Sequence, residues 1–137
     1  MNPAPMPVIA AFYAGLIGLM LLVLAIPVSR LRHSLKVGLG DGGSVRLTRA
    51  IRAHANTVEW ALPTLLLLLL AELNRAPSLA LHACGIALVV GRVLHAVGLS
   101  STGGSSFGRF VGTSLTWAAL AVLALWDIWA FGRLAFV

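Results

Sequence analysis

Apolar residues fill four long stretches of the 137-residue chain, each close to the length of a membrane-spanning helix. The stretches cover residues 8–28, 57–71, 79–99 and 111–131. About 20 helical residues cross about 30 Å of hydrocarbon, and the second stretch reaches that length once its polar prelude is included. None of the stretches shows the period-two alternation of a barrel strand. The pattern predicts an all-α membrane protein, a bundle of four transmembrane helices forming one domain over residues 1–137.

Composition excludes an ordinary soluble domain, because 59% of the residues are hydrophobic and only 10% are charged. The first apolar stretch is too long for the core of a signal peptide, and no Lys or Arg precedes it. We therefore expect it to be retained as a helix. The net charge of +6 does not indicate nucleic acid, since no basic surface with interleaved aromatic residues lies outside the predicted spans.

The positive charges are unevenly distributed and predict an orientation. Seven Lys or Arg residues lie in or beside the first and third connections, and two lie on the opposite side. This bias predicts that connections 1 and 3 are cytoplasmic and that both chain ends lie outside. The seven are Arg30, Arg32, Lys36, Arg46, Arg49, Arg52 and Arg109, and the two are Arg75 and Arg133.

A polar stripe of Arg49, Arg52, Asn56 and Glu59 opens the second predicted helix. Arg52, Asn56 and Glu59 fall within about 60° of one another on a helix. Charged groups at membrane depth are costly and usually face a protein interior or a water-filled cavity. A stripe with both signs of charge and an amide is suited to a small zwitterionic or anionic ligand.

The third predicted helix carries its own polar pair, Arg92 and His95, which share a face. Arg92 lies roughly 10 Å below the cytoplasmic end, a depth that Glu59 also reaches on its helix. Two interpretations stay open. Arg92 and Glu59 form an ion pair that ties two helices together, or both belong to a ligand site. Buried ion pairs are poor stabilisers, which favours the site.

The connection before the polar stripe is rich in glycine. It lacks the Gly-Lys-Ser/Thr ending of a phosphate-binding loop and follows no strand. We expect a turn in which Asp41 or Ser44 caps the next helix, starting near Ser44. The single cysteine, Cys84, is expected to pack as a small apolar residue, and no Cys/His spacing suggests a metal site.

The four tryptophans and Asp127 suggest where helices end. The tryptophans mostly suit helix ends, where indoles sit at headgroup level. Asp127, beside two of them, is expected to be a solvated charge at the end of a helix. The tryptophans are Trp60, Trp117, Trp126 and Trp129.

Two motifs resemble the MAPEG superfamily, the membrane-associated proteins in eicosanoid and glutathione metabolism. The motif of the second helix reads Arg49-x-x-Arg52-Ala53-His54-x-Asn56-x-x-Glu59, and that of the third reads Gly91-Arg92-x-x-His95. The glycine-rich loop resembles the bacterial branch. The resemblance covers nearly the whole chain, and the second-helix motif is the more specific of the two.

This resemblance implies a homotrimer in a bacterial inner (cytoplasmic) membrane, with glutathione as co-substrate bound between subunits near the cytoplasmic face. It implies a transferase or peroxidase acting on lipophilic electrophiles in the bilayer. Arg109 resembles the arginine that contacts the glutathione thiol in catalytic members. The positions that match glutathione-binding residues are Arg30, Arg52, Asn56, Glu59, Arg92 and His95.

Two other functions stay in view. The family includes a non-catalytic lipid-binding protein, and Ala55 and Leu99 stand where some catalytic members have an arginine and a tyrosine. The alternative is therefore a non-catalytic membrane lipid- or anion-binding protein of the same fold. A drug/proton antiporter is disfavoured, because it needs an embedded carboxylate in a central aqueous cavity and the first stretch has none.

Overall fold

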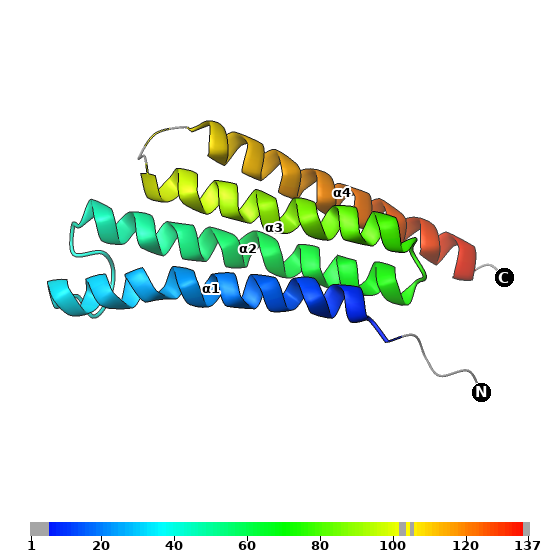
Figure 1. Cartoon of the computed structure of the whole chain (residues 1–137), viewed down its shortest axis with the longest axis horizontal. Helices are drawn as coiled ribbons and strands as arrows, with labels where there is room; N and C mark the ends of the chain where they lie inside the picture. The colour runs from blue at the N-terminus through cyan, green and yellow to red at the C-terminus, as the bar shows by residue number, and fades with distance from the viewer. Residues whose placement is uncertain (1–5, 102–103, 105, 136–137) are drawn as a thin grey trace.

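Four long helices account for nearly all of the structure (Figure 1). This computed structural model describes residues 6–101, 104 and 106–135, and no strand occurs among them. The helices are α1 (Val8–Leu35), α2 (Val45–Leu73), α3 (Ser78–Ser101) and α4 (Phe107–Ala135). All four are long and apolar enough to cross a membrane. The predicted four-helix membrane bundle is confirmed.

The helices run beyond the apolar stretches that predicted them. α1 continues to Leu35, and α2 begins at Val45, so much of the basic segment 29–53 is helical. Arginine and lysine favour helix about as well as leucine does. Hydropathy therefore marks the edge of the apolar layer rather than the end of a helix. The predicted cap is confirmed: the Ser44 side chain accepts a hydrogen bond from the Leu47 N–H at 3.4 Å.

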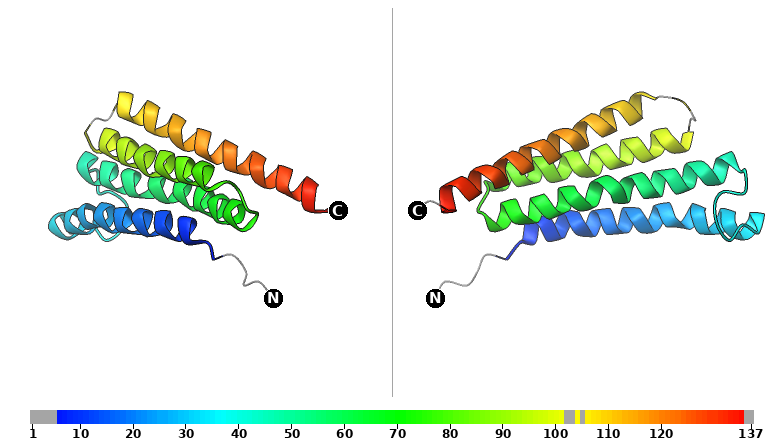
Figure 2. Two further views of the ribbon diagram at one scale, coloured as in Figure 1. Left: turned by 45° about the vertical axis from the view of Figure 1, so that its right-hand side comes forward. Right: turned by 180° about the vertical axis from the view of Figure 1, so that it is seen from behind.

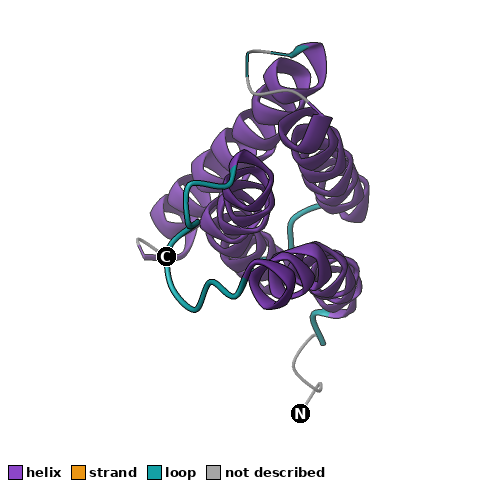
Figure 3. Ribbon diagram, turned by 90° about the vertical axis from the view of Figure 1, so that its left-hand side faces the viewer, coloured by secondary structure: helices purple, strands orange, loops and turns teal. Residues whose placement is uncertain are grey.

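Successive helices lie side by side in chain order (Figures 1 and 2). The α1–α2 and α3–α4 connections lie at one end of the bundle, which faces the viewer in Figure 3, and the α2–α3 turn lies at the other. Contacts join α2 to the three other helices, and α3 does the same. Within the described residues α1 and α4 do not touch. The molecule is thus a central α2–α3 pair flanked by two helices.

Residues from all four helices build the core. The larger cluster lies towards the α2–α3 turn and includes Tyr13, Leu68, Leu81 and Leu123. Cys84 is buried in this cluster as a free thiol, which confirms the predicted packing role. Apolar packing of this kind holds the ends of the four helices together.

Glycines let α3 and α4 approach closely at the other end. A Cβ atom on Gly91 would lie 2.8 Å from the carbonyl oxygen of Gly112 and from the Thr116 hydroxyl. Small residues at helix contacts permit such backbone packing in lipid. By contrast, Gly15 and Gly18 of α1 face open space. The small-residue surface of α1 is therefore not used within one chain.

Glu72, near the end of α2, caps the start of α1. Its carboxylate oxygens accept hydrogen bonds from the backbone N–H groups of Ile9 at 2.9 Å and Ala10 at 2.7 Å. Pro7 precedes the helix and provides no side-chain cap. The first N–H groups of a helix lack internal partners and carry partial positive charge, so a carboxylate stabilises them. Sequence patterns gave no expectation for this contact.

The α1–α2 connection is the glycine-rich turn that was predicted. Gly40, Gly42 and Gly43 have φ angles of 70°, 56° and 76°, which lie in the left-handed region. Asp41 accepts hydrogen bonds from the Thr48 hydroxyl at 2.7 Å and the Gly43 N–H at 3.0 Å. These bonds favour the ionised carboxylate and lower the pKa of Asp41. The loop is thereby fixed to the first turn of α2.

Candidate functional site

Arg92 is the most deeply buried charged group among the described residues, with 1% of its surface exposed. Its Nε donates to the Thr116 hydroxyl at 3.0 Å, and its Nη1 donates to Asn56 Oδ1 at 2.9 Å. Its Nη2 donates to the carbonyl oxygen of Gly112 at 3.2 Å. The planar guanidinium fork thus joins α2, α3 and α4 through neutral acceptors. Of the two interpretations left open by the sequence, the Arg92–Glu59 ion pair is therefore ruled out.

Glu59 instead pairs with Arg52 on its own helix. Arg52 Nη1 lies 3.9 Å from Glu59 Oε1, and the two side chains are 55% and 52% exposed. Exposed pairs of this kind contribute little to stability. Both charges are therefore available to a ligand. Asn56 lies between them in the sequence, and its side-chain oxygen is engaged by Arg92.

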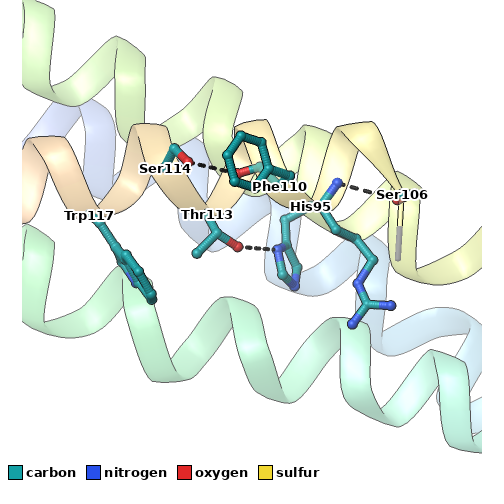
Figure 4. A pocket seen from close by; sticks show the side chains of 7 residues that line it. His95, Ser106, Phe110, Thr113, Ser114 and Trp117 are labelled. Carbon is teal, nitrogen blue, oxygen red and sulfur yellow. Dashed lines mark hydrogen bonds between the residues drawn. The ribbon is translucent and has the colours of Figure 1, made fainter. Parts of the chain in front are cut away.

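A cleft of about 370 Å³ opens on α4 beside the start of that helix (Figure 4). His95 enters it from α3, largely buried, with its Nδ1 3.0 Å from the Thr113 hydroxyl. Figure 4 shows these two side chains pointing toward one another. We call it the α4 cleft; its lining residues are His95, Ser106, Arg109, Phe110, Thr113, Ser114 and Trp117.

Arg109 stands in the first turn of α4, where the α4 cleft begins. Its backbone N–H donates to the Ser106 hydroxyl at 3.3 Å, so Ser106 caps the helix. Its guanidinium donates to the carbonyl oxygen of Gly104. A cation, an imidazole and two aromatic rings therefore border one cleft. This combination suits an anionic atom held next to an apolar molecule.

The sequence-predicted residues fall into pairs, with one exception. The pairs are Asn56 with Arg92 by hydrogen bond, Arg52 with Glu59 by charge, and His95 with Arg109 in the α4 cleft. Arg30 is exposed and has no hydrogen bond or ion pair with any described residue. Because α1 and α4 do not touch, one chain does not bring Arg30 to the α4 cleft.

Sequence reasoning missed the contributions of α4. Thr113 and Thr116 hold His95 and Arg92, yet nothing about either threonine in the sequence marks it as polar support. The helix-end expectation is wrong for Trp60 and Trp117, which pack against each other inside the spans with ring centroids 5.8 Å apart and planes tilted by 49°. The available signal was position, because both tryptophans lie well inside their helices and away from the helix ends.

A second basic pocket, of about 350 Å³, lies between α1, α2 and the end of α3 at the same end of the bundle. Arg46 and Arg49 line it together with Pro27 and Ser100. Arg49 Nε is buried without a hydrogen-bond partner among the described residues. Arg49 and Asn56 are seven residues apart and therefore share one face of α2, with Arg49 in this pocket and Asn56 bonded to Arg92 two turns further along the helix.

Comparison with known proteins agrees with this architecture. The MAPEG family profile matches residues 10–129, which include every predicted site residue. The inner membrane protein YecN of Escherichia coli strain K12 is 38% identical over 121 residues, covering 88% of this chain and 91% of YecN. YecN of Escherichia coli O6:H1 strain CFT073 matches with the same identity and coverage. With four membrane spans and both polar motifs inside the matched region, the chain belongs to the MAPEG family.

Proposed function

We propose that the protein binds glutathione in the bacterial inner membrane and acts on lipophilic electrophiles, as a glutathione transferase or peroxidase. The observation that carries the proposal is the α4 cleft, where Arg109 and His95 share one wall with Phe110 and Trp117. Such a cleft offers a cation to a thiolate and aromatic surface to an apolar molecule. The name of YecN supports the membrane assignment.

The exposed charges of α2 suit the two charged ends of the tripeptide. On binding, a glutathione carboxylate would pair with Arg52 and the glutathione ammonium group would pair with Glu59, which replaces the Arg52–Glu59 pair. The exchange costs little because the existing pair is exposed and 3.9 Å apart. Arg92, at 1% exposure, is assigned to holding Asn56 in place rather than to contacting the ligand. Arg92 is then a positioning residue.

Arg109 is assigned to stabilising the thiolate. A free thiol has a pKa of about 8.5, so a shift to about 6.5 requires roughly 2.7 kcal/mol of preferential thiolate stabilisation. The thiol proton passes to solvent, the thiolate sulfur forms a bond to the electrophilic carbon, and the leaving group departs with its electron pair. The electrophile arrives from the lipid along Phe110 and Trp117, which are 73% and 54% exposed. Holding both reactants together lowers the entropic part of the barrier.

A homotrimer is part of the proposal. The open surface at Gly15 and Gly18 suits close packing of α1 against a second copy. Arg30, unpaired with any described residue of its own chain, would then face a neighbour's α4 cleft. The separation of α1 from α4 within one chain is the feature that makes an intersubunit site reasonable.

A glutathione titration by calorimetry tests the function, with native mass spectrometry and a conjugation assay on the same detergent-purified sample. We expect a species near three times 14.4 kDa, heat of glutathione binding, and conjugation of 1-chloro-2,4-dinitrobenzene. Binding without conjugation would favour the non-catalytic alternative. That alternative is consistent with Ala55 and Leu99, which stand where some catalytic members have an arginine and a tyrosine. Absence of binding would refute the glutathione site.

Arg109→Ala should abolish thiolate formation while leaving most of the glutathione affinity. In the parent protein, thiolate absorbance at about 240 nm should appear when glutathione binds at neutral pH. At pH 7, a thiol pKa that rises from about 6.5 to about 8.5 lowers the thiolate fraction, and with it the conjugation rate, by about 25-fold. Arg133→Ala, at the other end of α4, is the matched control and should keep both signals. Equal thiolate in Arg109→Ala and the parent would place the activating group elsewhere.

A further inference from the structure

A pocket of about 460 Å³ lies at the opposite end of the bundle from the α4 cleft. It forms where α2 ends and the last turns of α4 pass, beside the α2–α3 turn on the right of Figure 1. We call it the tryptophan pocket; its lining residues are Asn74, Arg75, Trp126, Trp129, Ala130 and Arg133. Neither the MAPEG motifs nor the proposed glutathione chemistry uses any of them.

Two arginines at this end of the bundle, Arg75 and Arg133, both line the tryptophan pocket. Of the ten Lys and Arg residues, Arg75 and Arg133 are the pair on the side that the charge bias leaves poor in cations. The nearby acids do not line the pocket. Glu72 is engaged by the start of α1, and Asp127 Oδ1 accepts from the Asn74 amide at 3.3 Å. The pocket wall therefore has two cations and no carboxylate.

Asp127 corrects an expectation drawn from the sequence. It lies inside α4, half-buried, with its Oδ2 buried and without a partner among the described residues. It is not a solvated charge at a helix end. Because its bond to Asn74 fixes that side chain, Asp127 helps to shape the wall of the pocket without entering it.

The two indoles form an aromatic platform along one side of the pocket. Trp126 Nε1 is buried and has no hydrogen-bond acceptor among the described residues, which is costly for a donor. Trp129 packs against Trp126, with ring centroids 4.9 Å apart. Arg133 Cζ lies 4.9 Å from the centre of the Trp129 ring. This stacking holds the guanidinium by its face and leaves its N–H edge free to donate.

We propose that the tryptophan pocket binds the phosphate group of an anionic phospholipid. The phosphate oxygens accept hydrogen bonds from Arg75 and Arg133, which line the pocket together with the two indoles. Indoles at this position sit at headgroup level, and a phosphate ester is the anion found there. The acyl chains continue along the apolar outer surface of α4, where Leu125 and Ile128 are 67% and 69% exposed.

The backbone at Arg75 permits a substitution that removes the cation without harming the fold. Arg75 has a φ of 60°, in the left-handed region that glycine adopts without steric cost. Arg75→Gly therefore deletes the side chain while easing the backbone. Lys36 has a φ of 56° at the end of α1, at the other end of the bundle. Lys36→Gly makes the same kind of change there and is the matched control.

Tryptophan fluorescence in vesicles tests the proposal. In a Trp60→Phe/Trp117→Phe background, the remaining emitters are Trp126 and Trp129. The protein is reconstituted in phosphatidylcholine vesicles with a fraction of brominated phosphatidylglycerol or, separately, the same fraction of brominated phosphatidylcholine. We expect the anionic lipid to quench at least about twice as strongly, because its headgroup is attracted to the two arginines. Arg75→Gly and Arg133→Gln should each remove this excess, while Arg133→Lys and Lys36→Gly retain it.

Three results would overturn the proposal. Equal quenching by the two lipids in the parent would show no preference at this end of the bundle. An excess that persists in both Arg75→Gly and Arg133→Gln would place the anionic lipid on other residues. Loss of the excess on adding millimolar glycerol phosphate to the water would assign the pocket to a soluble phosphate ester.

Discussion

Arg92→Ala is expected to lower the free energy of unfolding by about 3–5 kcal/mol. The substitution deletes a long buried side chain and leaves a cavity between α2, α3 and α4. It also strips Asn56, Thr116 and the Gly112 carbonyl of a donor. The Gly112 carbonyl keeps the Thr116 hydroxyl as a donor at 2.9 Å, whereas the Asn56 side-chain oxygen loses its partner, and an unpaired acceptor adds to the cost of the cavity. The loss of helicity during titration with sodium dodecyl sulfate, from mild detergent, measures the change.

Two further variants show whether burial is the cause. Arg52→Ala removes a charge of the same kind from an exposed position and should cost no more than about 1 kcal/mol. Arg92→Lys retains the charge but lacks the planar guanidinium that reaches three acceptors. Its stability should therefore lie between those of Arg92→Ala and Arg52→Ala. If Arg92→Ala and Arg52→Ala unfold at the same detergent fraction, Arg92 does not hold the helices together.

Gly112→Val should be the most damaging single substitution in α4, at a cost of about 3 kcal/mol. A Cβ atom at Gly112 would meet the Gly91 carbonyl oxygen and would lie 2.7 Å from the His95 backbone nitrogen. These are backbone atoms, so relief requires α3 and α4 to separate. Separation would also draw Thr116 away from Arg92. The same detergent titration measures the loss.

Gly132→Val is the matched control for that substitution. Gly132 lies in the same helix, and a Cβ atom there meets no other atom within 4 Å. Its effect should stay within about 0.5 kcal/mol, since helix propensity favours valine slightly over glycine. Similar losses at both positions would mean that the cost arises from valine in α4 and not from the approach of the two helices.

The fold was predictable because membrane thickness imposes a length on every apolar run. Four continuous stretches were enough to place four helices, and the turn chemistry around Ser44 was enough to start α2 correctly. The end of α1 was beyond reach, because Arg30 and Arg32 continue the helix after the apolar run has stopped. Charged residues mark where the segment leaves the apolar layer, whereas the end of the helix depends on where backbone hydrogen bonding stops.

The candidate site was predictable in its residues and less so in its pairings. Polar side chains inside apolar runs identified Asn56, Glu59 and Arg92. Charge then suggested that Arg92 and Glu59 attract one another. The structure satisfies Arg92 with a threonine hydroxyl, an amide and a backbone carbonyl, while Glu59 stays with Arg52. Neutral acceptors on a distant helix leave no mark in a single sequence, so their contribution required the three-dimensional packing.

The neutral acceptors around Arg92 also bear on how the chain is synthesised and inserted. Asn56 has already been made when α3 emerges, but Thr116 follows Arg92 by 24 residues. If Arg92 entered the lipid before its hydrogen-bond acceptors, the cost of burying its charge would not be offset by hydrogen bonds. We therefore expect α3 to remain beside the insertion machinery until α4 has been translated. The two helices would then enter the bilayer together as a hairpin, with α1 and α2 already in place.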